Sequence, residues 1–284
     1  MSEVLTASTV EAPSGKDAAY ENFPVGSWLL PARLRPHVAV FYAFARAIDD
    51  IADSPRLTAE MKISRLEGFA RALKGEALDP VGYAKAYAMR ETLAATGISE
   101  AHCLDLIAAF KQDAFKRRYA DWSELIDYCY KSAAPVGRFL IDLHGGCRYG
   151  YAAADALCNA LQIINHLQDC RDDYLDLDRV YLPQDWLAEA HAAVDDLARH
   201  RCTPALRRVF DRALDGVEAL LAAARPLPRQ LSNRRLAMEA AAIIDIAYAL
   251  VRRLRCEDPL AARVHLSKLE YAWSVGRGAV SVWV

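Results

Sequence analysis

Apolar residues recur along this chain at the three- and four-residue spacing of helix faces, and strand-like alternation is nearly absent. The stretch from His37 to Asp53, HVAVFYAFARAIDDIAD, is apolar around most of the helix that it predicts. Alanine and leucine are frequent, and only 13 of the 284 residues are glycine, which also favours helices. We therefore expect helices at about residues 36–53, 58–74, 79–95, 99–117, 121–145, 151–176, 184–200, 203–224 and 233–256, and a last helix after residue 258.

The sequence carries no sign of a division into several domains. Prolines at positions 36, 204 and 259 stand where helix starts are expected, and no repeat, low-complexity linker or change of composition interrupts the chain. We expect a single all-α domain over residues 18–284. Residues 1–17 lack the basic start and the apolar run of a signal peptide, and we expect them to form a disordered leader. No apolar run reaches about 18 residues, so no membrane-spanning helix is expected.

Composition and charge narrow the class of protein further. Hydrophobic residues make up 54% of the chain and charged residues 25%, which is enough for a packed core. A net charge of −2 argues against a nucleic-acid-binding protein. The seven cysteines include no C-x-x-C pair, so we expect free thiols in the cytoplasm, not a disulfide framework or a zinc site. A mean hydropathy of zero is high for a soluble protein, so peripheral contact of the protein with the inner membrane stays open.

Three aspartates stand close together at the end of the first predicted helix. Positions four apart on a helix differ by only about 40° in direction, so Asp49 and Asp53 project from one face, while Asp50 points about 100° aside. Arg46 lies one turn before Asp49 on nearly the same face. Because this helix is apolar around most of its circumference, we expect it to be buried, and its carboxylates must then be paired or metal-bound.

A second acidic cluster, NHLQDCRDD, follows on a later predicted helix. Gln162, Asn165, Asp169 and Asp173 step by three, four and four positions and form one polar stripe. The neighbouring positions on this helix are apolar: Leu157, Leu161, Ile164 and Leu167. Either stripe alone is more often a solvated helix face, but two such stripes on apolar helices favour a functional site.

Magnesium fits this pair of acidic stripes. Mg²⁺ prefers oxygen ligands, keeps several waters and often bridges one or two carboxylates to substrate phosphates. The chain has no P-loop, so nucleotide hydrolysis is not implied. Two acidic helices facing each other above an apolar cavity would suit a diphosphate group with a prenyl chain below it.

Three ordered motifs make the sequence resemble the squalene/phytoene synthase family. LLPARLRPHVAVFYAFARAIDDIAD resembles the opening motif of that family, and LIDYCYKSAAPVGRFL resembles its tyrosine–cysteine segment, which ends in Val-Gly. QIINHLQDCRDDYLDLDRVYLP resembles its second aspartate motif, which is followed by Arg-Val-Tyr-Leu-Pro. The resemblance covers about residues 20–275. It implies the all-α fold of class I isoprenoid synthases of the head-to-head type, built around a central apolar cavity.

The resemblance also implies roles for individual residues. Mg²⁺ would be bound by Asp49, Asp53, Asp169 and Asp173, with Asn165 adding an amide oxygen or a hydrogen bond. The diphosphate would be met by guanidinium groups from Arg35, Arg46 and Arg179. A carbocation would be stabilised by aromatic faces among Phe41, Tyr42, Phe44 and Phe139. Further substrate-binding candidates are Val136, Gly137, Gln162, Tyr248 and Arg263, and Lys131 is a catalytic candidate.

Within the family, the segments ENFPVGSWLLP and SAAPVGR resemble the hydroxysqualene-forming branch of bacterial hopanoid pathways. That resemblance implies a reaction of presqualene diphosphate with water, giving hydroxysqualene and diphosphate. It also implies one enzyme that makes presqualene diphosphate and another that reduces hydroxysqualene. The sequence departs from the usual synthase pattern at Asn22 before Phe23, at Lys131, at Ala134 and at Gln168. These departures are compatible with a specialised second half-reaction.

Several alternatives stay open at this point. A head-to-head prenyltransferase, such as a presqualene diphosphate, squalene or phytoene synthase that condenses two prenyl diphosphates, would share every aspartate. A non-catalytic assembly factor of the same fold would be expected to lose these aspartates, and both pairs are intact. Single residues also have a structural alternative to a role in the site. Arg35 and Lys131 could be ordinary surface residues, and Phe41 and Phe44 could be ordinary residues of the hydrophobic core.

Overall fold

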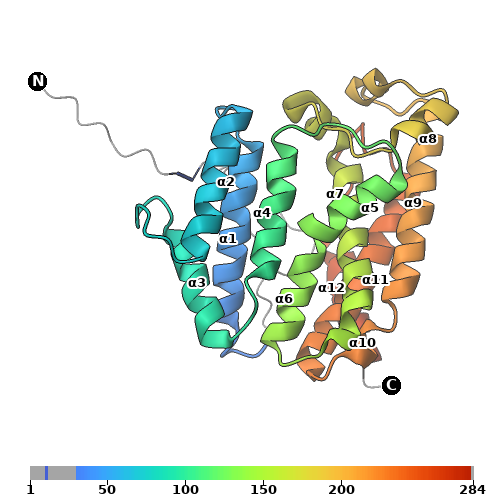
Figure 1. Cartoon of the computed structure of the whole chain (residues 1–284). Helices are drawn as coiled ribbons and strands as arrows, with labels where there is room; N and C mark the ends of the chain where they lie inside the picture. Colours follow the sequence, from blue (N-terminus) through green and yellow to red (C-terminus); the bar gives the residue numbers. More distant parts are fainter. Residues whose placement is uncertain (1–9, 12–29, 283–284) are drawn as a thin grey trace, which may run out of the picture.

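The computed structural model describes residues 10–11 and 30–282, and these form a bundle of α-helices (Figure 1). The helices are α1 (Arg35–Asp53), α2 (Ala59–Leu73), α3 (Ala84–Thr96), α4 (Ala101–Asp113), α5 (Trp122–Ser132), α6 (Ala134–Leu143), α7 (Tyr151–Leu177), α8 (Gln184–Glu189), α9 (Pro204–Ala224), α10 (Leu227–Gln230), α11 (Arg234–Cys256) and α12 (Lys268–Ser281). Short 3₁₀ turns occur at η2 (Arg148–Gly150) and η3 (Val194–Ala198). In this described part, β-type pairing is limited to one bridge between Arg118 and Val180, which confirms the all-α prediction.

The expected leader falls almost entirely outside the described residues, as does the Asn22–Phe23 position. Val10 and Glu11 are described. The backbone carbonyl of Val10 accepts a hydrogen bond from Arg65 of α2 at 2.8 Å, and Glu11 pairs with Lys85 of α3 at 2.6 Å. These two residues therefore contact the outer side of the α2–α3 pair.

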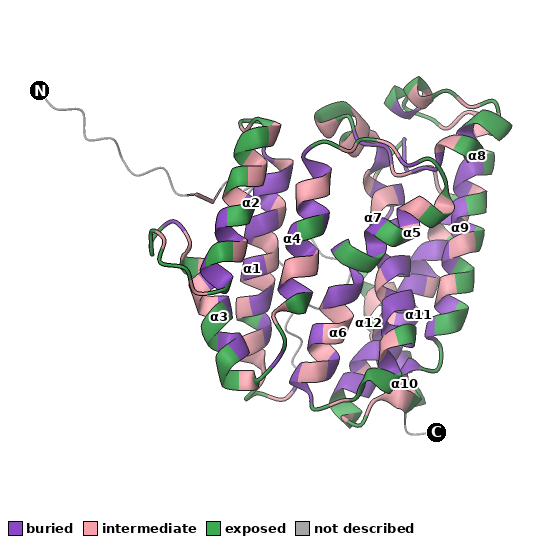
Figure 2. Ribbon diagram, viewed as in Figure 1, coloured by how far each residue is buried: buried purple, intermediate pink, exposed green. Residues whose placement is uncertain are grey.

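The long helices lie side by side, with α1 to α4 on one side of the bundle and α9, α11 and α12 on the other (Figure 1). Helix α1 packs against α2, α3 and α4, whereas α7 packs against α6, α9 and α11, and α11 also contacts α12. The buried faces point inward from both groups (Figure 2). Because helix faces with apolar spacing need a partner, this packing buries one contiguous apolar cluster that extends from α1 to α11.

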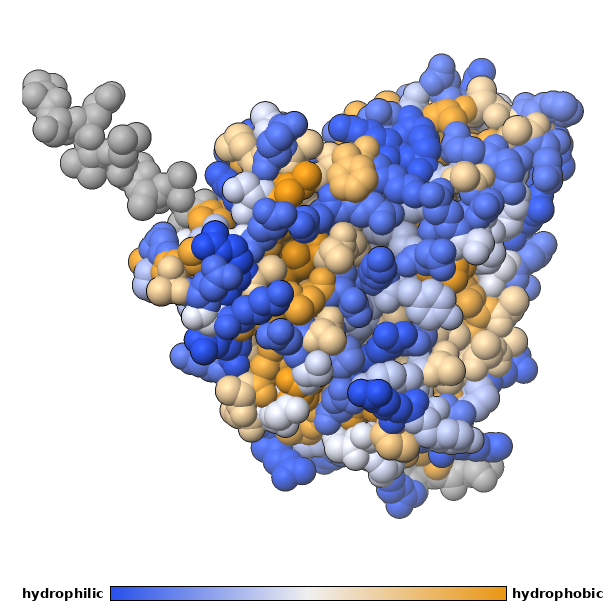
Figure 3. Space-filling view, in the orientation of Figure 1, coloured by the Kyte–Doolittle hydropathy of each residue, from blue (hydrophilic) through white to orange (hydrophobic). Residues whose placement is uncertain are grey.

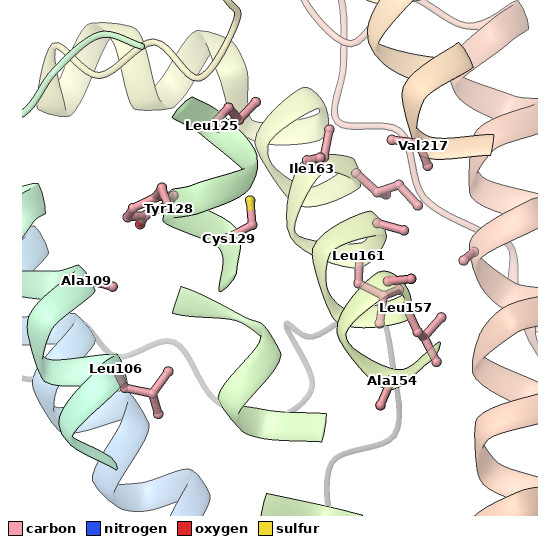
Figure 4. Close-up of a cluster of buried hydrophobic side chains, with 14 of the residues drawn as sticks. Leu106, Ala109, Leu125, Tyr128, Cys129, Ala154, Leu157, Leu161, Ile163 and Val217 are labelled. Atoms are coloured by element: carbon pink, nitrogen blue, oxygen red, sulfur yellow. The ribbon is translucent and has the colours of Figure 1, made fainter. Parts of the chain in front are cut away.

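Figure 4 shows part of that cluster, where side chains of α4, α5, α7 and α9 meet. Leu125 and Cys129 of α5 are buried, as are Leu161 and Ile163 of α7. The face of the molecule seen in Figure 3 is mostly hydrophilic, with separate apolar areas. Among the described helices, none combines the length and the apolar character required to cross a bilayer.

The helix expected at 121–145 is divided into α5 and α6. Ala133, at the junction, has φ −126° and ψ −46°, outside helical values. Pro135 has no N–H to bond the carbonyl of Lys131 four residues back, and its ring crowds that carbonyl, so α5 does not continue unbroken into α6. The break ends α5 at Ser132 and lets α6 begin in a new direction, which the apolar pattern alone does not reveal.

Two other expected helices differ from the structure. The one at 184–200 is reduced to α8 and η3, and His191 between them has a positive φ of 54°, which is incompatible with a continuous helix. The last helix does not start at Pro259. Instead Asp258 binds the backbone N–H groups of Cys202 and Leu260, and α12 starts at a capping box formed by Ser267 and Glu270.

Candidate active site

A cavity of about 350 Å³ opens between α1, α4, α5, α6, α7 and α11. Asp49, Asp53 and Asp173 line one end, whereas Val38 and Leu231 are among the apolar residues of the other. Helix α1 carries residues of both ends, and the 15 positions from Val38 to Asp53 span about 22 Å. The cavity therefore has a charged end and a long, mainly apolar remainder, although the buried Glu239 of α11 also lines it, and this shape suits an amphiphile with a charged head.

Helix α1 supplies one wall of the charged end. Asp49 and Asp53 both line the cavity, and Arg46 pairs with Asp49 at 3.1 Å and with Asp50 at 2.7 Å. Burial raises the pKa of Asp49 well above its usual range. The negative charge of Asp53 raises this pKa further, while Arg46 opposes the shift. Two carboxylates one turn apart in a desolvated site create a strong demand for positive charge.

Helix α7 supplies the opposing wall. Gln162, Asn165, Asp169 and Asp173 all line the cavity, as the stripe predicts. Arg263, which lies between α11 and α12, pairs with Asp169 at 2.9 Å. The two aspartate pairs, which are far apart in sequence, therefore face one chamber.

His166 also reaches the chamber from α7, although its sequence context does not single it out. Its ring stacks on Tyr181 with centroids 3.5 Å apart and 10° between the planes, and its Nδ1 lies 3.9 Å from Asp173. Burial lowers the pKa of His166, so the neutral ring is favoured. Tyr181 therefore both packs and lines the site.

Arg179 joins three elements at the charged end. The guanidinium, which is buried, pairs with Asp53 at 2.5 Å and donates to the backbone carbonyls of Ala52 and Asp113 at 3.0 and 3.1 Å. The segment after α7 is thereby attached to the C-terminal ends of α1 and α4. Carbonyls at helix C-termini lack intrahelical donors, so the arginine satisfies groups that would otherwise be unpaired.

Asp113 is a further acidic residue of the cavity that the sequence interpretation missed. It ends α4, lines the cavity and accepts a hydrogen bond from the hydroxyl of Tyr128 at 2.7 Å. Burial raises the pKa of Asp113 to about 7, although Arg179 opposes the rise. A single aspartate at a helix end has no periodic partner, so only its tertiary position identifies it.

Most of the predicted site residues meet at this cavity. Those that line it are Phe41, Tyr42, Arg46, Asp49, Asp53, Val136, Gly137, Gln162, Asn165, Asp169, Asp173, Arg179 and Arg263. Gly137 is required by close packing of α6 on α7, because a Cβ there would lie 2.8 Å from the sulfur of Cys158 and 3.3 Å from the Cβ of Ala154. A glycine at this point brings the wall of α6 close to α7.

Five side chains that we expected at the site do not line the cavity: Phe44, Phe139, Lys131, Arg35 and Tyr248. Phe44 is fully buried and its ring packs on Phe69 of α2, because it points away from the aspartate face of α1. Phe139 is also in the core, where it stacks on Phe41 at 4.0 Å. These two rings therefore support the walls of the cavity.

The remaining three lie in other surroundings. Lys131 is on the exposed side of α5, next to but not within the cavity wall. Arg35 donates to the carbonyl of Leu30 at 3.0 Å, in the first turn of α1 and far along that helix from Asp53. The hydroxyl of Tyr248 accepts a hydrogen bond from Arg225 at 3.1 Å, between α11 and the end of α9. Direct roles for these side chains in the chemistry have no support in this geometry.

The carboxylates of the charged end lie as two pairs and do not form a closed cage. No three His, Cys, Asp or Glu side chains of residues 10–11 and 30–282 converge closely enough to enclose a metal ion. Each aspartate pair instead lines its own wall, α1 or α7. Mg²⁺ commonly retains waters and is held by one or two carboxylates together with substrate phosphates. The donor set therefore fits an ion whose coordination is completed by water and a diphosphate.

Residues 17–270 match the profile of the squalene/phytoene synthase family. The chain belongs to the squalene/phytoene synthase family. Among characterised members, hydroxysqualene synthase of Rhodopseudomonas palustris is 42% identical over 93% of this chain and 89% of its own length. Hydroxysqualene synthase of Zymomonas mobilis is 39% identical over 90% of this chain and 86% of its own length. Phytoene synthase of Thermus thermophilus is also similar, at 31% identity over 88% of this chain and 85% of its own length.

Solved structures give the same picture of the family fold. Squalene synthase HpnC from Alicyclobacillus acidocaldarius superposes with a TM-score of 0.71 and 33% identity, covering 81% of this chain and 86% of its own. A dehydrosqualene synthase in complex with a ligand superposes with a TM-score of 0.79 over 92% of both chains. At 18% identity, this second likeness shows the fold alone. The expected class I isoprenoid synthase architecture is thus confirmed.

Proposed function

We propose that this protein is a hydroxysqualene synthase, which converts presqualene diphosphate and water to hydroxysqualene and diphosphate. One observation carries the proposal: Asp49 and Asp53 on α1 and Asp169 and Asp173 on α7 line the charged end of a single cavity whose remaining lining is mainly apolar. The likeness to hydroxysqualene synthases over about nine-tenths of the chain supports this particular reaction within the family.

The four aspartates and Asn165 would hold Mg²⁺, directly or through water. The ion would supply positive charge that stabilises the diphosphate as a leaving group. The demand for such charge is already visible in the raised pKa of Asp49. Asp53 and Asp169 pair with Arg179 and Arg263 in this structure, so ion binding would release guanidinium groups at the charged end.

Arginines at the charged end would then bind the diphosphate. Arg46, Arg179 and Arg263 all line this part of the cavity, and the planar guanidinium matches phosphate oxygens with two parallel hydrogen bonds. When the C–O bond of the substrate breaks, the electron pair leaves with the diphosphate, and these arginines would keep that anion at the charged end.

The apolar part of the cavity would hold the hydrocarbon and protect the cation. Val136, Leu157 and Leu161 line it and exclude bulk water, so the cation would meet only water that the protein admits. Phe41 and Tyr42 also line this wall and could place aromatic faces against positive charge, at about 0.5–2 kcal/mol each.

We further propose a cytoplasmic enzyme that makes peripheral contact with the inner membrane and works between two other enzymes. One of these would make presqualene diphosphate and the other would reduce hydroxysqualene. Because substrate and product both carry long apolar chains, exchange with a bilayer is favourable. The side chains of Leu269 and Trp273 on α12 are 84% and 73% exposed and could contact such a surface. Sedimentation with vesicles of mixed anionic and neutral phospholipid tests the contact, and an absence of co-sedimentation would contradict it.

An assay with two substrates tests the reaction. Purified protein with Mg²⁺ and presqualene diphosphate, without NADPH, is expected to give hydroxysqualene and one equivalent of diphosphate. The same protein with farnesyl diphosphate alone is expected to give no C30 product. Formation of presqualene diphosphate, squalene or another C30 hydrocarbon from farnesyl diphosphate alone would instead identify a head-to-head prenyltransferase.

A further inference from the structure

The wall that α5 and α6 present to the cavity carries two polar side chains among its described lining residues. The lining residues of this wall are Tyr128, Ser132, Ala133, Val136, Gly137, Leu140 and Ile141, of which Tyr128 and Ser132 are the polar ones. The hydroxyl of Tyr128 is already committed, since it donates to Asp113 at 2.7 Å. Ser132 is therefore the one side chain of this wall whose polar group is not accounted for by the charged end.

Ser132 is held in place by the break between the two helices. It is the last residue of α5, and the N–H of Ala133 after it still bonds to the carbonyl of Cys129 at 2.9 Å. Pro135 prevents the helix from continuing. The backbone of Ser132 is therefore fixed on the wall, which suits a group that must orient a small molecule.

Among the residues that the structure describes, none forms a hydrogen bond with the hydroxyl of Ser132. The residue is only 7% exposed. Buried hydroxyls in native proteins almost always have a partner, which is either protein or ordered water. Ser132 is one of the residues that line the cavity, so a water bound at the cavity wall would satisfy this hydroxyl.

The position of Ser132 along α5 suits attack at the reacting carbon. Ser132 and Tyr128 are four residues apart, so they share a helix face and are separated by about 6 Å along the axis. Figure 4 shows Tyr128 on the side of α5 that faces α4, where it reaches Asp113. Ser132 thus lies one turn from the acidic end, where the carbon released from the diphosphate would begin.

We infer that Ser132 holds the water that becomes the hydroxyl group of hydroxysqualene. This inference rests on the proposed function and adds a positioning residue to it. The C–O bond to diphosphate breaks first, and a lone pair of the water then forms a new C–O bond to the rearranged cation. Ser132 Oγ accepts a hydrogen bond from one O–H of that water, and the proton lost from the oxygen goes to the released diphosphate.

Product analysis of two variants tests this inference. Ser132→Ala removes the hydroxyl, and Ser132→Cys keeps the approximate volume but replaces the oxygen with a poor acceptor. With presqualene diphosphate and Mg²⁺ in H₂¹⁸O, the wild type is expected to give hydroxysqualene that carries ¹⁸O. Both variants are expected to release diphosphate, with about a tenfold fall in the ratio of hydroxysqualene to all other C30 products. A tenfold change corresponds to about 1.4 kcal/mol, within the range for a single hydrogen bond.

Two further variants separate positioning from structure. Ser132→Thr keeps an oxygen acceptor and is expected to retain most of the hydroxysqualene ratio. Ser274→Ala removes another buried serine hydroxyl, on α12 and outside the residues that line the cavity, and is expected to leave the product ratio unchanged. These controls make the product ratio a measure of the water site and not of general stability.

The outcomes distinguish the inference from the proposed function. An unchanged product ratio in both Ser132→Ala and Ser132→Cys overturns the inference alone, even if the rate falls. Absence of hydroxysqualene from the wild type overturns the proposed function, and the inference falls with it. A lower ratio in both variants, with retention in Ser132→Thr, supports the inference.

Discussion

Single side chains at the charged end differ in chemistry according to the direction in which they leave their helix. On α7, Asp173 lines the cavity, whereas Asp172 next to it is exposed. One residue corresponds to about 100° of rotation, so adjacent aspartates of one sequence motif have unrelated surroundings. The motif DCRDD therefore provides its own internal control for the proposed metal site.

Asp173→Asn is expected to lower turnover of presqualene diphosphate by about 100-fold or more, because a neutral amide cannot supply the charge that holds a divalent ion beside a diphosphate. Asp172→Asn is expected to retain nearly full turnover. Steady-state rates at saturating Mg²⁺, with circular dichroism to verify folding, provide the measurement. Equal loss in the two variants would show that the negative charge of the helix matters and not the particular wall position.

The same residue scale shows where reasoning from sequence succeeds and where it stops. The i, i+4 spacing was sufficient to predict Asp49/Asp53 and Asp169/Asp173, because helix geometry fixes which side chains share a face. It was not sufficient for Asp113, whose role depends on its contact with Tyr128 and on the meeting of α4 with α1. Lys131 illustrates the reverse case, since it belongs to a motif but lies on the exposed side of α5.

Elements are positioned by small residues and caps that the apolar pattern does not display. The pattern predicted most helices, yet it merged α5 with α6, because Pro135 and the apolar residues around it give opposing signals. Likewise, the start of α12 is determined by hydrogen bonds of Ser267 and Glu270, whereas Pro259 alone suggested an earlier start. Both features emerge only when local hydrogen bonds are known.

Gly137 sets how closely α6 approaches α7. Gly137→Ala is expected to destabilise the protein by about 1–3 kcal/mol, because the new Cβ would lie 2.8 Å from the sulfur of Cys158. In a Cys158→Ala background the same change is expected to cost much less, since the closest contact is gone and alanine is the better helix former. Urea unfolding of the two single variants and the double variant gives the coupling, and strict additivity would contradict this explanation.

The docking of α12 is expected to depend on pH through Glu270. Hydrogen bonds from Arg253 and from Ser267 hold the pKa of Glu270 at about 2. Because the folded pKa lies below that of an unfolded glutamate, the contribution is present above about pH 4.5 and is lost as the pH falls towards 2.

The comparison of wild type with Glu270→Gln isolates this contribution. The variant is expected to be less stable than the wild type at pH 7, and the difference is expected to shrink between about pH 4.5 and pH 2. Urea midpoints of both proteins across this range provide the measurement. A difference that stays constant with pH would show that the charge of Glu270 does not attach α12 to α11.

At the scale of the whole molecule, the site exists only because two distant segments meet. Asp49 and Asp169 are 120 positions apart in the sequence, and the helices between them must pack before the two walls face each other. The resemblance to a family predicted that meeting, whereas the periodicity of each helix could not, because periodicity reports one face at a time. Binding at the charged end should therefore report on the integrity of the whole bundle.

Inorganic diphosphate and Mg²⁺ are expected to raise the thermal unfolding midpoint together, by about 5 °C at roughly 100 times the Kd, and to raise it much less when either is added alone. The reason is that each aspartate pair is completed by waters and phosphate oxygens, so ion and anion bind the native state as one unit. An Asp49→Asn/Asp169→Asn double variant removes one carboxylate from each wall and is expected to lose the shared increment. Addition of EDTA should reverse the shift in the wild type. Equal shifts from diphosphate alone and from diphosphate with Mg²⁺ would mean that the arginines bind the anion without the aspartates, so that the two acidic walls do not act together.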